Sequence, residues 1–208
     1  KQYKKIKIKT ILEYSLSSFI KCRKINFVVV VYNKKHYKFI APLVNKYKKI
    51  KFILGANNRQ QSCLNALNAI AKEEKYSTVI IHDAARPLVS LKLINKLIKS
   101  KSNNHAVIPA LEVTNSLKLV KKNFVVKSIE RKDLSYSQTP QLFPLKKLNN
   151  AYDKINKKNL LNYTDDAQIF SEAGNKVLVV PGDEDNFKIT NLNDFKKARK
   201  LLLSESIM

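Results

Sequence analysis

The stretch that decides the fold reads Val79-Ile80-Ile81-His82-Asp83-Ala84-Ala85-Arg86-Pro87. Its apolar start is typical of a β-strand. The strand ends abruptly in an acid, two small residues, an arginine and a proline. Ligands collect outside the carboxyl ends of the strands of an open parallel sheet. The carboxylate of Asp83 is therefore placed to meet a metal, a ribose or a phosphate-bearing substrate.

The rest of the chain alternates between the apolar periods of strands and of helices. The pattern predicts strands at about residues 27–32, 51–54, 78–82, 106–109 and 177–180, and helices at about residues 10–19, 36–47, 60–71, 91–98, 144–155, 164–173 and 191–203. This order predicts a doubly wound, Rossmann-like α/β fold with a mostly parallel sheet. Residues 111–138 show short alternating runs without a helical period, so we predict a β-arm that projects from the sheet.

Length and composition predict a single domain over residues 1–208. No apolar run reaches the roughly 18 residues that span a bilayer, and no signal-like start is present, so we expect a soluble, cytoplasmic protein without a membrane partner. Cys22 and Cys63 lack the spacing of metal ligands. We expect both to be reduced thiols in or near the core, as suits a cytosol-like compartment.

The net charge of +24 comes from 40 basic and 16 acidic residues. Such an excess is compatible with a nucleic acid, a membrane surface or a polyanionic small molecule as partner. The lysines are spread over several predicted helices and are not gathered into one stripe with interleaved aromatic residues. We therefore interpret most of the charge as solvated surface and do not expect a nucleic-acid partner.

Several motifs carry a resemblance to a known family. They are His82-Asp83-Ala84-Ala85-Arg86-Pro87, Arg59-Gln60-Gln61-Ser62, Thr139-Pro140-Gln141, Thr164-Asp165-Asp166-Ala167 and Asp185-Asn186-Phe187-Lys188-Ile189-Thr190. In this order and spacing the chain resembles the 2-C-methyl-D-erythritol 4-phosphate cytidylyltransferases, a family of nucleotidyltransferases, over essentially its whole length. It also resembles the cytidylyltransferase half of bifunctional enzymes that carry a cyclodiphosphate synthase.

The resemblance implies a reaction and its participants. A cytidylyl group passes from CTP to 2-C-methyl-D-erythritol 4-phosphate, which gives 4-diphosphocytidyl-2-C-methyl-D-erythritol and pyrophosphate in the non-mevalonate isoprenoid pathway. The implied cofactor is Mg²⁺ or another divalent cation. The implied assembly is a homodimer in which each arm, at about residues 111–138, completes the other subunit's site.

The resemblance also implies which residues carry the chemistry. Catalytic roles fall on Lys1 and Lys188. Nucleotide contacts fall on Ser62, Asp83, Ala84 and Ala85, and Asp83 is also the implied metal ligand. Acceptor contacts fall on Asp83, Ser116, Arg131, Thr164, Asp165 and Lys188, with Ser116 and Arg131 reaching the neighbouring subunit's site.

These residue types suit the chemistry. Cytidylyl transfer gathers several negative charges, so catalysis is mostly positioning and charge neutralisation. Opposite charges about 4 Å apart gain roughly 4 kcal/mol at an effective dielectric near 20, so well-placed lysines and Mg²⁺ lower the barrier substantially. An arginine fork at position 131 suits a phosphate dianion.

Each position also has an ordinary structural interpretation. Asp83 could cap the next helix or pair with Arg86, and Lys188 could be one more surface lysine. Ser62 could be an ordinary serine in the first turn of a helix, and Thr164 could be the N-cap of one. Arg86 and Pro87 are expected to shape the turn.

The sequence departs from the family at its start. The family opens with a strand and a glycine-rich loop with an arginine, whose backbone N–H groups cradle the triphosphate. The chain has three glycines, and none precedes Lys1. A sheet without this central strand has unpaired edges. We therefore expect the strand and loop to precede Lys1 in the natural protein, and we expect the 208-residue chain alone to be inactive.

Two other functions remain open from the sequence. A ribitol-5-phosphate cytidylyltransferase would share the fold and the nucleotide site, although the pair Ala84-Ala85 argues against it. A non-catalytic, RNA-binding remnant of the fold would account for the charge and for the absent loop. An assay of the two acceptors and a salt-sensitive RNA gel shift distinguish these alternatives.

Overall fold

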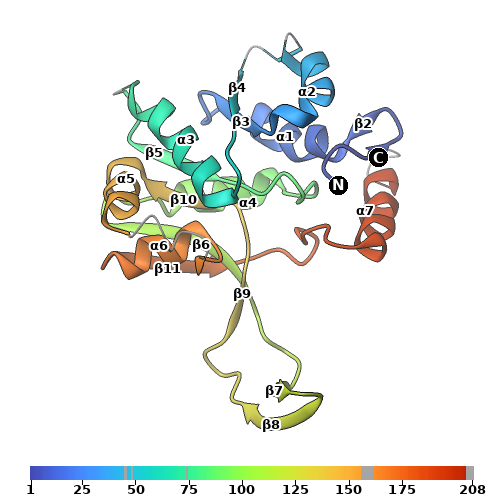
Figure 1. Ribbon diagram of the computed structural model, residues 1–208, viewed down its shortest axis with the longest axis vertical. Coiled ribbons are helices and arrows are strands. Elements are labelled where there is room, and N and C mark those ends of the chain that lie inside the picture. The colour runs from blue at the N-terminus through green and yellow to red at the C-terminus, as the bar shows by residue number, and fades with distance from the viewer. Residues whose placement is uncertain (45, 48, 74, 156–161, 205–208) are drawn as a thin grey trace.

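The main sheet is mixed and contains both parallel and antiparallel strand pairs. The computed structural model describes residues 1–208 except 45, 48, 74, 156–161 and 205–208. The strands lie in the order β11 (Lys176–Pro181), β6 (His105–Glu112), β10 (Gln141–Pro144) and β5 (Thr78–Ile81), and β9 (Ser135–Ser137) also pairs with β6. β11 runs parallel to β6, whereas β10 runs antiparallel to both β6 and β5 (Figure 1). The predicted α/β fold is confirmed, but the main sheet is mixed rather than mostly parallel, because β9 and β10 run antiparallel to the other strands.

The helices follow the predicted order. They are α1 (Ile11–Lys21), α2 (Tyr37–Val44), α3 (Arg59–Ala71), α4 (Leu91–Lys99), α5 (Leu145–Lys154), α6 (Asp166–Glu172) and α7 (Leu192–Ser204), and a 3₁₀ helix, η1 (Lys34–His36), precedes α2. Side chains cap several N-termini, with Thr10 and Glu13 forming a reciprocal capping box on α1. The predicted cap of the last helix is confirmed, because Asn191 Oδ1 accepts the Asp194 N–H at 2.9 Å.

Helices cover both faces of the main sheet, as a doubly wound fold requires. Side chains that alternate along β6 and β10 point to opposite faces. Ile108 and Phe143 belong to a core cluster with residues of α3, α5 and α6. Val107 and Leu142 instead pack with Leu97 of α4. Because both faces of β6 and β10 are covered by apolar side chains, these strands are mostly continuous apolar runs in the sequence.

A second, smaller sheet consists of β3 (Val28–Tyr32) and β4 (Ile50–Leu54), which run parallel. Among the described strands β3 pairs with β4 alone and β5 with β10 alone. The continuous apolar run at residues 27–32 predicts a strand that is buried on both faces, as parallel strands usually are. This prediction is wrong in detail, since Val30 is the one buried residue of that range in the described structure. A cavity beside β3, described below, leaves its other side chains half-buried.

Three local features differ from the sequence prediction. A short hairpin of β1 (Lys5–Ile6) and β2 (Lys9–Thr10) precedes α1, with Lys7 at a positive φ of 51° in its turn. β10 was not predicted, because it has only four residues and directly follows Pro140. The second helix is also shorter than the predicted 36–47, because it ends at Val44, and the 3₁₀ helix η1 precedes it.

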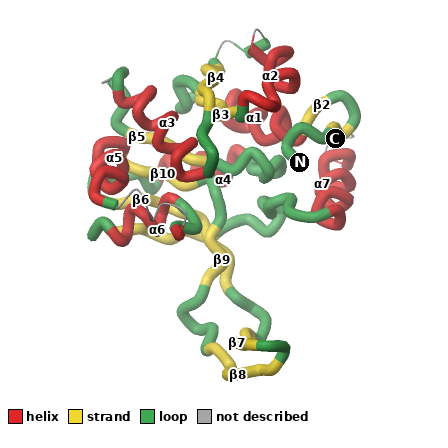
Figure 2. The backbone as a smooth tube through the Cα atoms, viewed as in Figure 1, coloured by secondary structure: helices red, strands yellow, loops and turns green. Residues whose placement is uncertain are grey.

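The predicted arm is a β-hairpin that projects from the body (Figure 2). β7 (Leu117–Lys121) and β8 (Phe124–Ile129) pair antiparallel, and Lys122 and Asn123 turn the chain at positive φ. The arm is shorter than the predicted 111–138, because residues 111–112 and 135–137 belong to β6 and β9 of the main sheet. Its free part therefore comprises about residues 113–134.

Within the ranges that the structure describes, no helix combines the length and the apolar character needed to cross a bilayer.

Candidate active site

The loop after β5 is held by a short relay of hydrogen bonds. The Asp83 backbone N–H donates to Thr139 Oγ1 at 3.0 Å, and this hydroxyl lies 3.1 Å from His82 Nδ1. His82 Nε2 lies 3.1 Å from the Arg86 carbonyl oxygen, which can only accept, so Nε2 carries the proton and Nδ1 accepts from Thr139. Burial lowers the pKa of His82 to about 4, which keeps the ring neutral. The relay fixes the backbone that presents Asp83.

The Asp83 carboxylate lies among cationic side chains. Lys188 Nζ is 2.9 Å from Oδ2, Arg59 Nε is 3.6 Å from Oδ1, and Arg86 Nε is 3.7 Å from Oδ2. Burial alone would raise the pKa of Asp83, but the hydrogen bond and charge of Lys188, with the charges of Arg59 and Arg86, hold this pKa below its ordinary value. Asp83 is thus an ionised carboxylate facing several positive charges.

The alternative roles considered for Asp83 are now resolved in part. The next helix, α4, is capped by Ser90, whose side chain accepts the Leu93 N–H. Asp83 therefore does not cap that helix. It does pair with Arg86, and it pairs with Lys188 at a shorter distance.

Backbone contacts bring Lys188 to Asp83. The Ile189 N–H donates to the Ala85 carbonyl at 2.9 Å, and Arg86 Nη1 donates to the Asn186 carbonyl at 2.8 Å. The Asn186 side chain is fully buried and donates to the Thr139 carbonyl at 2.8 Å. These bonds fasten the segment after β11 to the loop after β5, which explains how residues distant in sequence meet at one carboxylate.

A second carboxylate, Asp166, lies behind Arg59. Arg59 Nη2 is 2.6 Å from Asp166 Oδ2, and the Tyr152 hydroxyl donates to Asp166 Oδ1 at 2.6 Å. Burial lowers the pKa of Arg59, but the charges of Asp166 and Asp83 and the hydrogen bond to Asp166 raise it above its ordinary value. Sequence reasoning gave neither residue a role, although both lie in motifs that carry the family resemblance. An ion pair between the first residues of two helices leaves no local signal in the sequence.

Ser62 and Ala84 are partly buried, and Ala85 is buried. Ser62 Oγ accepts the Ala56 N–H at 3.0 Å and donates to the Asn58 carbonyl at 2.7 Å, so it braces the turn between β4 and α3. Ala84 accepts a hydrogen bond from Ser15 Oγ at 2.9 Å, and Ala85 is buried. The nucleotide contacts expected of these residues stay predictions.

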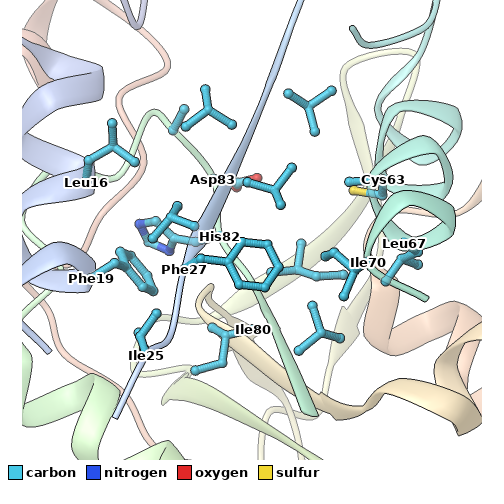
Figure 3. Close-up of a pocket in the computed structure, with 18 of the residues that line it drawn as sticks. Leu16, Phe19, Ile25, Phe27, Cys63, Leu67, Ile70, Ile80, His82 and Asp83 are labelled. Atoms are coloured by element: carbon cyan, nitrogen blue, oxygen red, sulfur yellow. The ribbon is translucent and has the colours of Figure 1, made fainter. Parts of the chain in front are cut away.

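A cavity of about 580 Å³ lies beside this centre. Its lining includes Arg59, Ser62 and Asp83 together with apolar side chains from α1, β3, α3 and β5. Figure 3 shows His82 and Asp83 among these apolar residues, with Cys63 and Leu67 contributed by α3. The cavity adjoins both β3 and β5, whose outer edges pair with no described strand. The strand expected before Lys1 stays a prediction.

Lys1 is not joined to the Asp83 centre by any contact among the described residues. Its carbonyl accepts the Lys4 N–H at 3.0 Å, and its amino group lies 3.5 Å from the Gln2 side chain. The neighbouring residues Gln2 and Tyr3 line the cavity. The structure thus brings Lys188 to Asp83, whereas the catalytic role expected of Lys1 stays a prediction.

The expected acceptor residues Thr164 and Asp165 precede α6. Asp165 is the N-cap of this helix, since its Oδ1 accepts the Gln168 N–H at 2.9 Å, and its Oδ2 accepts from Gln141 Nε2 at 2.9 Å. The interpretation of Thr164 as the N-cap is therefore wrong. Thr164 lies one residue earlier, where its hydroxyl donates to Gln168 Oε1 at 3.1 Å.

Ser116 and Arg131 lie at the base of the arm. Ser116 directly precedes β7, and Arg131 follows β8, where it donates to the Thr114 carbonyl. No contact joins either residue to the Asp83 centre within the described part of one chain. Their role in a neighbouring subunit's site stays a prediction.

The described residues contain no cluster of three or more His, Cys, Asp or Glu side chains that could hold a metal by themselves. Asp83 offers one ionised carboxylate. Mg²⁺ is commonly bound by one or two carboxylates together with substrate phosphates and water, so this single ligand suits a metal that arrives with a nucleotide.

Comparison with known proteins gives the family. The family model described as IspD, 2-C-methyl-D-erythritol 4-phosphate cytidylyltransferase, matches residues 1–204. The chain is 41% identical over 200 residues to the bifunctional enzyme IspD/IspF of Pelagibacter ubique, and the match covers 94% of this chain and 51% of that protein. It is 36% identical over 199 residues to the 2-C-methyl-D-erythritol 4-phosphate cytidylyltransferase of Wigglesworthia glossinidia brevipalpis, covering 95% of this chain and 85% of that one.

Solved structures agree with this assignment. The 2-C-methyl-D-erythritol 4-phosphate cytidylyltransferase of Francisella tularensis has a TM-score of 0.83 and 34% identity, with 96% of this chain and 92% of that chain covered. The bifunctional IspDF of Campylobacter jejuni has a TM-score of 0.75 and 28% identity, with 95% of this chain and 48% of that chain covered. The chain thus spans about half the length of its bifunctional relatives. It belongs to the 2-C-methyl-D-erythritol 4-phosphate cytidylyltransferase (IspD) family.

Proposed function

We propose that this protein is a nucleotidyltransferase that moves a cytidylyl group from CTP to 2-C-methyl-D-erythritol 4-phosphate, as the names of its relatives state. The observation that carries the proposal is the ionised Asp83 carboxylate, which lies at the end of β5 with Lys188 Nζ at 2.9 Å. A strand end with an acid and several cations suits a reaction between two phosphate groups. The product would serve the non-mevalonate route to isoprenoid precursors.

In the proposed reaction a phosphate oxygen of the acceptor attacks the α-phosphorus of CTP. The new phosphorus–oxygen bond forms as the bond from the α-phosphorus to the bridging oxygen of the β-phosphate breaks, and pyrophosphate leaves. The electron pair of the broken bond stays on pyrophosphate. The protein has little covalent chemistry to perform, so it works by positioning the two phosphates and by neutralising their charge.

Lys188 is the principal charge for this step. Its side chain is about two-fifths exposed, so its ammonium remains open to an incoming phosphate while it contacts Asp83. An opposite charge about 4 Å away gains roughly 4 kcal/mol at an effective dielectric of 20. Lys1 would add a second charge, and Ser62, Ala84 and Ala85 would border the nucleotide. Asp83 would hold Mg²⁺, which supplies further charge neutralisation when it is bound with the nucleotide.

The acceptor would lie between two subunits. The arm exposes apolar side chains, with Phe124 77% and Val125 62% accessible, which is unusual for a free surface. We propose that the arms pack in a homodimer, so that Ser116 and Arg131 of one subunit approach Thr164, Asp165 and Lys188 of the other. The guanidinium of Arg131 in this place would bind the acceptor phosphate through two parallel hydrogen bonds. The two free cysteines, Cys22 and Cys63, are compatible with the proposed cytoplasmic location.

The experiment is an acceptor comparison with the complete gene product, CTP and Mg²⁺. We expect release of pyrophosphate with 2-C-methyl-D-erythritol 4-phosphate and a kcat/KM at least about 100-fold lower with ribitol 5-phosphate, because a site that hydrogen-bonds the hydroxyls of one polyol phosphate leaves polar groups unpaired with a polyol of different length and branching. Turnover with ribitol 5-phosphate alone would contradict the proposed acceptor. A salt-sensitive RNA gel shift without CTP turnover would instead favour a nucleic-acid-binding role.

A further inference from the structure

Arg59 bridges two carboxylates from different parts of the fold. Its Nε lies 3.6 Å from Asp83 Oδ1, at the end of β5, and its Nη2 lies 2.6 Å from Asp166 Oδ2, at the start of α6. Arg59 itself opens α3. One guanidinium therefore connects the elements that carry the proposed metal ligand, the proposed nucleotide contact Ser62 and the proposed acceptor contacts Thr164 and Asp165.

Asp166 itself cannot touch a ligand. Its exposed fraction is 0%, and each carboxylate oxygen already has a partner, Arg59 on Oδ2 and Tyr152 on Oδ1. A buried ion pair seldom makes a protein more stable than apolar side chains of similar volume would in the same place. Arg59 Nη1 is also buried and finds no hydrogen-bond partner among the described residues. Packing stability alone does not account for this arrangement.

The geometry at Asp83 indicates what the bridge does. Lys188 contacts Oδ2 at 2.9 Å, whereas Arg59 faces the other oxygen, Oδ1. Positive charges on both oxygens fix the rotation of the carboxylate about its own axis. Asp166, in turn, determines where the guanidinium lies, because its bond to Nη2 is the shortest that Arg59 makes in the described structure.

We propose that Asp166 is a positioning residue for cytidylyl transfer: it clamps Arg59, and through Arg59 it sets the orientation of Asp83 and the spacing between α3 and α6. This inference rests on the proposed function. Since neither Asp166 nor its bond to Arg59 contacts a substrate, losing the clamp should misplace the reacting groups more than it weakens binding. Small misplacements of this kind lower rates by up to about 100-fold.

The test compares Asp166→Asn and Arg59→Lys with Tyr152→Phe in the complete gene product. Asp166→Asn removes the charge that clamps Arg59, and Arg59→Lys keeps a positive charge but cannot reach two carboxylates with one fork. Tyr152→Phe is the matched control, because it removes the other hydrogen bond to Asp166 and leaves the ion pair in place. The measurements are kcat, KM for CTP, KM for 2-C-methyl-D-erythritol 4-phosphate and the Tm of each variant.

We expect kcat to fall roughly 10- to 100-fold in both test variants while each KM changes by less than about threefold. Tyr152→Phe should lower Tm but keep kcat within about threefold. If Asp166→Asn does not fold, Arg59→Lys provides the test. Arg59 is partly exposed, so we expect its substitution to disturb folding less.

The results distinguish failure of the positioning role from failure of the proposed function. An active wild-type protein with unchanged kcat in the folded test variants, or with an equal loss of kcat in Tyr152→Phe, would overturn the positioning role and leave the proposed function intact. A wild-type protein that does not turn over CTP with this acceptor would overturn the proposed function, and the positioning role with it.

Discussion

The charge state of Asp83 and the groups that it can bind depend on the side chains around it. A carboxylate at a strand end could serve many α/β proteins, but here it faces Lys188, Arg59 and Arg86. The sequence predicted the position of Asp83, because a strand end is visible as the end of an apolar run. The family resemblance supplied Lys188. Neither the strand pattern nor the family resemblance could predict the ion pair between Arg59 and Asp166. An acid in the first turn of a helix normally faces solvent, where it interacts favourably with the positive end of the helix dipole.

The partly buried histidine beside Asp83 gives a prediction for pH. The pKa of His82 falls from 6.5 to about 4 on folding, since burial penalises the charged ring. The unfolded chain therefore binds more protons between these values, and the folded state loses stability as the pH falls from 6.5 towards 4. The full effect is about 3 kcal/mol in the free energy of unfolding, at about 1.4 kcal/mol per pKa unit.

His82→Gln removes the titrating ring and keeps a polar side chain. We expect wild-type protein to lose about 3 kcal/mol more than this variant between pH 7 and pH 4. Chemical denaturation at several pH values measures the difference, and the other titrating groups cancel in the comparison. Equal losses in the two proteins would show that His82 does not titrate in this way.

At the scale of elements, the strongly periodic segments were predictable and the context-dependent ones were not. α4 was predicted within one residue, because its apolar face repeats at helical spacing and Ser90 caps it. β10 was not predicted, since a four-residue strand between two others owes its conformation to the sheet around it. The β1–β2 hairpin, with two residues in each strand, is likewise too short to show a period.

The connection after β11 carries an element-scale prediction. A Cβ at Gly182 would lie 2.7 Å from Gln138 Oε1 and 3.0 Å from the Ala110 carbonyl oxygen. Gln138 is buried and its Oε1 accepts the Asp183 N–H, so it has little room to move. Gly182→Ala should therefore shift the segment that leads to Lys188, cost about 1 to 3 kcal/mol of stability and lower kcat.

Gly174→Ala is the matched control. This glycine has a φ of 87° and open space around its Cβ position, at the C-terminal end of α6. Alanine there should cost about 1 kcal/mol through backbone strain and leave kcat unchanged. Thermal unfolding and steady-state rates of both variants decide the matter. Full activity in Gly182→Ala would show that the rate of the reaction does not depend on the position of this segment.

For the whole molecule, the arm predicts an assembly. Phe124, Val125 and Val126 are each more than half exposed on β8, although a two-stranded hairpin is marginal by itself. Replacing Phe124 and Val126 by Asp should dissociate the proposed homodimer and lower activity at least about tenfold, because Arg131 would then leave the partner's site.

Sedimentation velocity measures this directly. The control is Ile8→Asp, since Ile8 is 85% exposed but lies in the β1–β2 turn, away from the arm. We expect a dimer for the control and the wild type and a monomer for the doubly substituted arm. A dimeric arm variant, or a wild-type monomer with full activity, would contradict arm exchange.

We propose that cytidylyl transfer occurs at the centre formed by Asp83 and Lys188. The most direct measurement is ³¹P NMR of CTP and 2-C-methyl-D-erythritol 4-phosphate with Mg²⁺ and the complete gene product, as wild type, Lys188→Met and Lys197→Met. Lys197 is the matched control, because its Nζ lies 4.5 Å from the Phe187 ring and makes no described contact with Asp83. We expect pyrophosphate and a new diphosphate diester in equal amounts for wild type and Lys197→Met, and a rate at least about 100-fold lower for Lys188→Met. No diester from the wild type, or an undiminished rate in Lys188→Met, would contradict this proposal.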